Sequence, residues 1–124
     1  MIADAPPVPV ADGAYAARTT ERRTITLVVR DGRVVRAAAT IARYPCRGFG
    51  DLGPVRVVVT VDAPIARTGR VAFAAGPAAE RLAVRARWRA GGAVTGALRL
   101  RGTIGTGEPC ASRRIRFSRA AARG

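Results

Sequence analysis

The sequence predicts an all-β protein, a single antiparallel meander of about eight strands that forms a β-sandwich or a flattened up-and-down barrel. Three observations support this prediction. Apolar and polar residues alternate at the two-residue period of a strand with one buried face, turn signals recur roughly every 8–12 residues, and no stretch has a sustained helical period. The 124 residues suffice for one hydrophobic core but not for two.

The clearest pattern is a hairpin that we expect over residues 80–101. Its first strand places four apolar residues on one parity: Leu82, Val84, Ala86 and Trp88. The returning strand repeats the alternation with Val94, Gly96, Leu98 and Leu100. Gly91 and Gly92 lie between the two strands and supply the turn. The hairpin should therefore have an apolar inner face and a polar outer face.

The same alternation justifies the other strands in chain order. We expect them at 14–18, 22–30, 33–43, 55–61 and 69–75, and finally around 115–117. Asp31-Gly32 is a type I′ turn signal between the second and third of these strands, because both residues tolerate positive φ. In the third strand we expect an inward face made of Val35, Ala37, Ala39 and Ile41. The core aromatic residues should be Tyr15, Phe73, Trp88 and Phe117.

The domain organisation predicted from composition is simple. Residues 1–12 are rich in Ala and Pro and should form an extended arm or linker, residues 13–119 the β-domain, and residues 120–124 a flexible basic tail. Apolar residues make up 48% of the chain but aromatic ones only 5%, so the core should consist of small and branched side chains. No apolar run approaches the ~20 residues of a membrane-spanning helix. Residues 1–12 do not have the pattern of a signal peptide.

The net charge of +14 favours a polyanionic partner. All 22 basic residues are arginine, and Ala, Gly, Val and Pro are also abundant, which is typical of a GC-rich genome. Such a bias explains the absence of lysine, but it explains less well why there are only 8 acidic residues.

Arginines gather on the predicted outer face of the hairpin and of the last strand. These candidate polyanion-binding residues are Arg85, Arg87, Arg89, Arg99, Arg101, Arg114 and Arg116. We expect the arginines of the two hairpin strands to lie beside each other, although like charges facing each other destabilise a sheet. The guanidinium fork suits phosphate, sulfate or carboxylate, so the partner could be an anionic cell-wall polymer, an acidic polysaccharide or an anionic lipid surface. The alternative is a solvated face that only keeps the protein soluble.

The two cysteines, Cys46 and Cys110, allow three interpretations: a structural disulfide, two buried free thiols, or a reactive thiol. Each lies beside a turn at the boundary of a predicted strand, which favours the disulfide. The chain has no histidine, and two thiolates fill only half of a tetrahedral zinc site. We therefore predict no metal site and no cofactor.

The sequence predicts no enzymatic activity, because a Ser-His or Cys-His pair is impossible without histidine. The glycines follow hairpins and do not form a phosphate-binding loop. The alternative from another class is a carboxylate-dependent hydrolase of polysaccharides, which needs two acids in one cleft. A further alternative is a cytosolic nucleic-acid-binding protein, which the scarcity of aromatic residues disfavours.

Several short motifs carry a resemblance to a known family. They are Gly13-x-Tyr15, Asp31-Gly32-x-Val34, Gly69-Arg70-Val71-x-Phe73, Val84-x-Ala86-x-Trp88, Thr95-Gly96-x-Leu98-Arg99 and Cys110-x-Ser112-x-x-Ile115-x-Phe117. Over about residues 13–119 the chain resembles a family of small secreted two-cysteine β-domains from high-GC soil bacteria, which has no assigned function. The resemblance implies export or a cell-envelope location, a Cys46–Cys110 disulfide and a sandwich or flattened barrel. Ala17 and Ala86 depart from the family pattern by replacing glycines.

Overall fold

The computed structural model describes residues 6–121, which fold into one antiparallel sheet of 11 strands. The strands are β1 (Gly13–Thr19), β2 (Thr24–Arg30), β3 (Arg33–Ile41), β4 (Pro45–Cys46), β5 (Gly50–Asp51), β6 (Val55–Pro64), β7 (Arg70–Ala75), β8 (Glu80–Trp88), β9 (Val94–Ile104), β10 (Glu108–Ala111) and β11 (Ile115–Arg119). One short 3-10 turn, η1 (Ala90–Gly92), separates β8 from β9. The predicted all-β fold class is confirmed.

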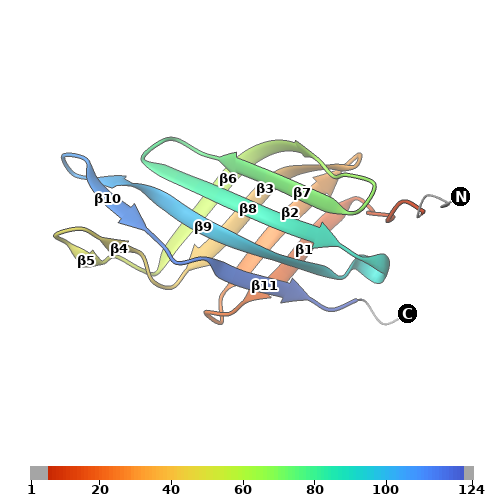
Figure 1. Ribbon diagram of the computed structural model, residues 1–124, viewed down its shortest axis with the longest axis horizontal. Helices are drawn as coiled ribbons and strands as arrows, with labels where there is room; N and C mark the ends of the chain where they lie inside the picture. Colours follow the sequence, from red (N-terminus) through yellow and green to blue (C-terminus); the bar gives the residue numbers. More distant parts are fainter. Residues whose placement is uncertain (1–5, 122–124) are drawn as a thin grey trace, which may run out of the picture.

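The sheet folds over onto itself and forms two layers (Figure 1). β1, β2, β3 and β6 make up one layer, and β7, β8, β9 and β11 cross in front of them. β11 connects the layers because it pairs with β9 and also with β1. Within residues 6–121, β6 and β7 share no ladder, so the sheet is not closed into a complete barrel.

The eight long strands follow one another around the two layers in chain order, as expected for the predicted meander. Three short strands were not predicted from the sequence: β4, β5 and β10, which have two, two and four residues. They extend the sheet beyond the second half of β9, where β10 pairs with β9 and β4 pairs with β10 (Figure 1). Their short length leaves no alternation to detect.

The core lies between the two layers and is filled mainly by Val, Leu, Ile and Ala side chains. Trp88 is fully buried, and its ring meets that of Tyr15 edge to face at 5.5 Å between centroids. Phe117 is also buried and Phe73 is partly buried against the core. The predicted aromatic core residues therefore all contribute to it.

The predicted inward face of β3 is wrong at one position. Ala37, Ala39 and Ile41 are buried as expected, but Val34 is buried in place of Val35. The register between β2 and β3 shifts by one residue here, because Val28 pairs with Arg36 while Val29 pairs with Val34. Such a bulge leaves one residue of β3 unpaired and reverses the parity before it. The sequence pattern alone does not reveal this reversal.

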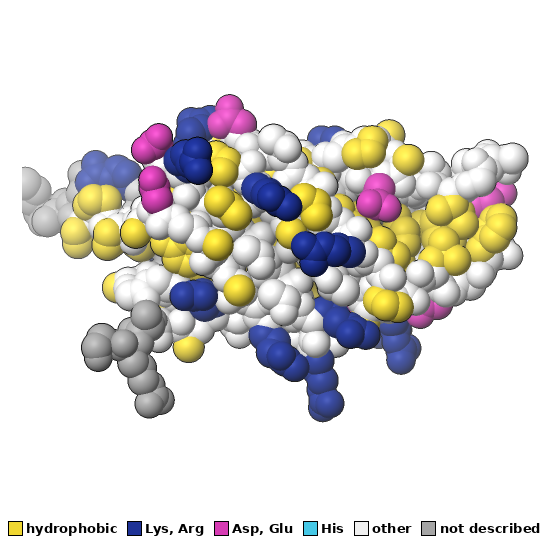
Figure 2. Space-filling model, turned by 180° about the vertical axis from the view of Figure 1, so that it is seen from behind, with side chains coloured by type: hydrophobic (Ala, Val, Ile, Leu, Met, Phe, Trp, Pro, Cys, Tyr) yellow, Lys and Arg dark blue, Asp and Glu magenta, His cyan; other side chains and the backbone are white. Residues whose placement is uncertain are grey.

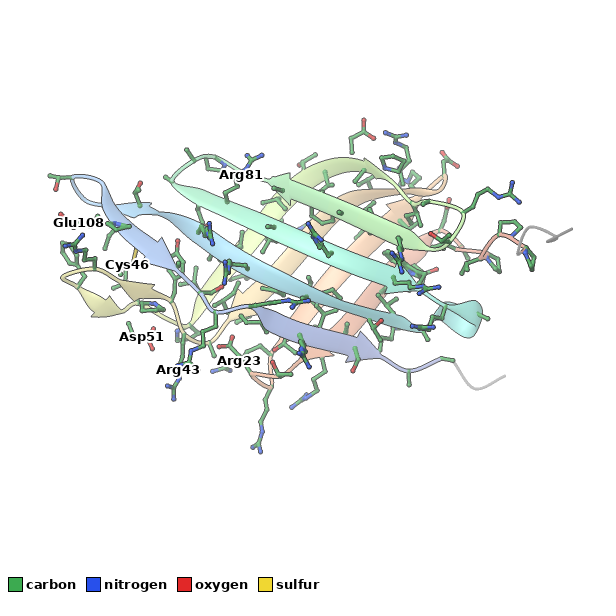
Figure 3. All side chains as sticks on the ribbon, viewed as in Figure 1. Arg23, Arg43, Cys46, Asp51, Arg81 and Glu108 are labelled. Carbon is green, nitrogen blue, oxygen red and sulfur yellow. A yellow bond between two sulfur atoms is a disulfide. The ribbon has the colours of Figure 1, made fainter. Side chains whose placement is uncertain are left out.

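A disulfide joins Cys46 and Cys110, which face each other directly across β4 and β10. Both residues are buried, and Figure 3 shows Cys46 at the end of the molecule that carries the β4–β5 hairpin. This settles the three interpretations of the cysteines in favour of the structural disulfide. The bond links the β4–β5 hairpin covalently to β10.

The predicted N-terminal arm is described from residue 6 onward, and residues 1–5 lie outside the described part. The backbone N–H of Val8 donates to the carbonyl of Arg67 at 2.9 Å. Val8 and Val10 pack, partly buried, against the core. Most of the predicted basic tail, residues 122–124, also lies outside the described residues.

Candidate polyanion interface

The outer face of the β7–β8–β9–β11 layer carries arginines among small residues. On β8 the side chains of Val84 and Ala86 are buried, so those of Arg85 and Arg87 point to the outside. On β9 the burial of Leu98 and Leu100 turns Ala97 and Arg99 outward in the same way. The arginines follow from the strand alternation, as sequence analysis predicted.

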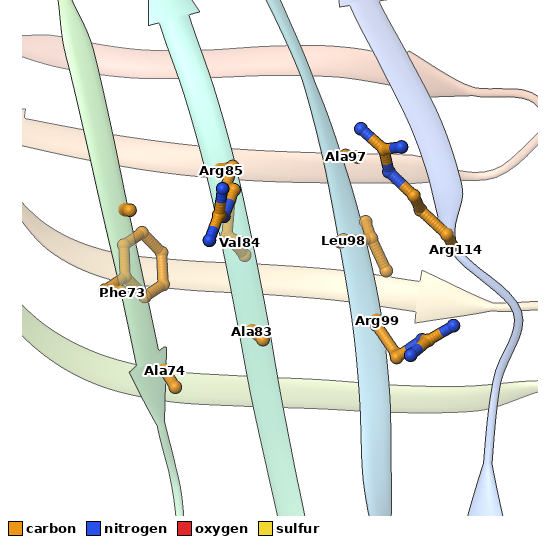
Figure 4. Close-up of a pocket in the computed structure, with 10 residues that line it drawn as sticks. Phe73, Ala74, Ala83, Val84, Arg85, Ala97, Leu98, Arg99 and Arg114 are labelled. Atoms are coloured by element: carbon orange, nitrogen blue, oxygen red, sulfur yellow. The ribbon is translucent and has the colours of Figure 1, made fainter.

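Two adjoining grooves lie on this face. The first has a volume of about 510 Å³ and is bordered by Arg85, Arg99 and Arg114, which stand around Ala97 in Figure 4. The second has a volume of about 590 Å³ and adds three further arginines, Arg70, Arg87 and Arg116. Because Arg85, Ala97 and Arg114 line both, the two form one continuous surface, which we call the arginine groove.

No aspartate or glutamate of the described residues lines the arginine groove. The one ion pair within residues 6–121 joins Arg33 and Asp62 at 2.5 Å, on the opposite layer. The carboxylate of Asp12 also lies there, because it accepts a hydrogen bond from the backbone N–H of Asp31. Figure 2 shows acidic side chains beside arginines on the outer face of this opposite layer, which is made of β1, β2, β3 and β6. The two outer faces therefore differ in electrostatic character.

The observed register modifies the expected arrangement of the hairpin arginines. On the β9 side, Arg85 pairs with Ala97 and Arg87 pairs with Thr95, so the residues of β9 directly opposite these two arginines are small. The exception is Arg101, which pairs with Arg81. The guanidinium of Arg81 donates to the carbonyls of Gly76 and Ala74 at 2.9 and 3.0 Å. The interleaved small residues provide the floor of the groove.

Of the seven predicted arginines, five line the arginine groove: Arg85, Arg87, Arg99, Arg114 and Arg116. Arg101 lies farther along β9, beside the pairing with β10, and Arg89 follows the end of β8. Arg70 was not among the predicted arginines; it pairs directly with Arg87 across β7 and β8. The sequence contained a signal for Arg70, because it precedes the apolar Val71 and so has the outward parity of its strand. A short hairpin between β7 and β8 then places Arg70 on the same outer face as Arg85 and Arg87.

Two carboxylates, those of Glu21 and Asp51, line a separate pocket of about 600 Å³. The Glu21 carboxylate accepts a hydrogen bond from the backbone N–H of Ala42 at 2.9 Å. The Asp51 carboxylate accepts hydrogen bonds from the backbone N–H groups of Gly53 and Tyr44, both at 2.8 Å, and these bonds lower its pKa. A general acid requires a raised pKa, so Asp51 is tuned in the opposite direction.

Residues 6–121 contain no group of three or more acidic, histidine or cysteine side chains placed to hold a metal ion. The described part of the chain also contains no helix of sufficient length and apolarity to span a membrane. No protein-family model, curated protein or solved structure matches the sequence.

Proposed function

We propose that this chain is an exported, non-enzymatic binding module whose arginine groove contacts an anionic polymer or cell surface. The observation that supports the proposal is the separation of charge: six arginines and no acidic residue of the described part line the groove. Guanidinium groups bind oxyanions in forked, charge-assisted pairs, and a bound polyanion would relieve the repulsion between them.

Export is part of the proposal and is supported by the Cys46–Cys110 bond. Structural disulfides persist in oxidising compartments and are rare in the cytosol. Membership in the family of small secreted two-cysteine β-domains belongs to the same proposal. In such a location the candidate ligands are cell-wall phosphate polymers, acidic polysaccharides and anionic lipid surfaces.

The test is a salt titration of binding to four labelled polymers: single-stranded DNA, RNA, a polyuronate and polyphosphate. If the six groove arginines each neutralise one anion of a flexible chain, the slope of log K against log salt should be about −4. The triple variant Arg85→Gln, Arg99→Gln, Arg114→Gln should reduce the magnitude of this slope by about 2, because three contacts are removed.

A matched control removes the same charge from the opposite layer. Arg30, Arg36 and Arg56 are exposed there on β2, β3 and β6, and their replacement by Gln should leave the slope nearly unchanged. Equal losses in the two triple variants would refute the proposal, because net charge alone would then explain binding. A preference for DNA or RNA that survives physiological salt would support the nucleic-acid alternative instead.

The hydrolase alternative has its own measurement. The pocket that contains Glu21 and Asp51 is the place to test it. Release of new reducing ends from a polysaccharide, lost in Glu21→Gln and in Asp51→Asn, would establish that activity and overturn the non-enzymatic assignment.

A further inference from the structure

The floor of the arginine groove includes an apolar shelf of small residues. It consists of four outward alanines from three neighbouring strands, Ala72, Ala74, Ala83 and Ala97. Ala74 pairs directly with Ala83, and Arg85 lies between Ala72 and Ala97 in one row across the sheet. Ala72, Ala74 and Ala83 are exposed. We call this set the alanine shelf.

Arginines lie both within the shelf, where Arg85 stands between Ala72 and Ala97, and along its side toward β9 and β11. Arg99 pairs directly with Ala83, and the side chain of Arg114 extends toward Ala97 (Figure 4). A ligand that covers the shelf therefore places one apolar surface on alanine methyl groups and its edge beside guanidinium groups. Arginines alone would be sufficient to attract an anion. The apolar shelf beside them therefore indicates a ligand that also has an apolar surface.

We propose, on the basis of the proposed function, that the ligand of the arginine groove is an acidic polysaccharide. One face of a pyranose ring is lined by C–H groups and can lie on the alanine shelf, while a carboxylate or sulfate on the ring is held by Arg85, Arg99 or Arg114. Polyphosphate offers the charge but no apolar face. Single-stranded nucleic acids use stacking on exposed aromatic rings, whereas the aromatic residue of the groove, Phe73, is half-buried against the core.

The experiment fills the shelf without changing any charge. Ala83→Leu adds bulk at an exposed outward position, and Ala74→Leu is a second, independent variant on the neighbouring strand. Ala14→Leu is the matched control, because Ala14 is exposed on β1 of the other layer. The probes are polygalacturonate, dextran sulfate and long-chain polyphosphate at physiological salt, and near-UV circular dichroism checks the fold of each variant.

Ala83→Leu and Ala74→Leu should each weaken binding of polygalacturonate or dextran sulfate at least about tenfold, because a few methylene groups change ligand discrimination by this amount. Binding of polyphosphate should change by less than about twofold, as in the Ala14→Leu control. Which of the two polysaccharides binds identifies the anion as carboxylate or sulfate.

Two results would overturn the inference and leave the proposed function intact. In the first, both leucine variants retain polysaccharide binding while the triple Arg85, Arg99, Arg114 variant loses it. In the second, the leucine variants weaken polyphosphate binding as much as polysaccharide binding. If the triple arginine variant keeps full affinity for every probe, both the inference and the proposed function fail.

Discussion

Replacing Cys46 and Cys110 together with alanine should lower the free energy of unfolding by about 4 kcal/mol. The disulfide closes a loop with a sequence separation of 64 residues. In the chain-entropy model, a loop of this length restricts the unfolded chain by about 14–15 cal/mol/K, which corresponds to about 4 kcal/mol at 25 °C. Alanine is the suitable replacement because both positions are buried and a serine would add a buried hydroxyl group.

Urea unfolding followed by tryptophan fluorescence measures this difference. The chain has one tryptophan, Trp88, and it is fully buried in the core, so its emission reports global unfolding. The wild-type protein in reductant is the control and should lose the same free energy as the double variant. A loss below about 1 kcal/mol in both would refute the loop-closure reasoning, since the unfolded chain would then gain little freedom from the missing bond.

Three further predictions concern single side chains. Ser112→Ala should lower the free energy of unfolding by about 1–3 kcal/mol in urea titrations, because the buried Ser112 hydroxyl accepts a hydrogen bond from the backbone N–H of Leu100 at 2.9 Å. The control Ser118→Ala changes an exposed residue and should alter the free energy of unfolding by less than about 0.5 kcal/mol. Asp51→Ala should lower the melting temperature at neutral pH, and the difference should shrink in acid. The pKa of Asp51 is lowered by folding, so its contribution is complete above the unfolded value of 3.8 and is lost as the pH falls through the folded value; a difference that grows in acid would contradict this assignment. Arg87→Thr should raise the free energy of unfolding of the unliganded protein by roughly 0.2–1 kcal/mol, because Arg87 faces Arg70 directly; a decrease in stability would show that the pair is not repulsive.

The long strands could be predicted from the sequence because each contains several alternating residues, as in Leu82, Val84, Ala86 and Trp88 of β8. β4, β5 and β10 escaped prediction because strands of two to four residues contain too little of that pattern. The inward face of β3 was ambiguous for a different reason. Val34 and Val35 are adjacent, and only the bulge against β2 decides which of them is buried.

The sequence predicted which arginines of the candidate site point outward, but not which residues lie beside each of them. Strand parity places Arg85 and Arg87 outside, whereas their direct neighbours depend on the register of the hairpin. That register is set by the turn, where the N–H of Arg89 donates to the carbonyl of Ala93 around η1. The turn spans more residues than Gly91 and Gly92, because the last strand pair before it is Trp88 with Val94. This longer turn changes which residues face each other, so the pairing of Arg85 with Ala97 could not be predicted from the sequence.

The choice of arginine over lysine and the placement of the arginines have different explanations. A codon bias acts on all surface positions alike, so it predicts arginine throughout the chain but no separation of acids from bases. In the fold, Asp62 pairs with Arg33 on one layer, while the described residues that line the arginine groove include no acid at all. The opposed pair of Arg70 and Arg87 adds a repulsion that a neutral residue at either outward position would remove. If Arg87→Thr gains stability and loses affinity for a polyanion, the repulsion is retained for binding; if stability rises with unchanged affinity, the pair reflects composition alone.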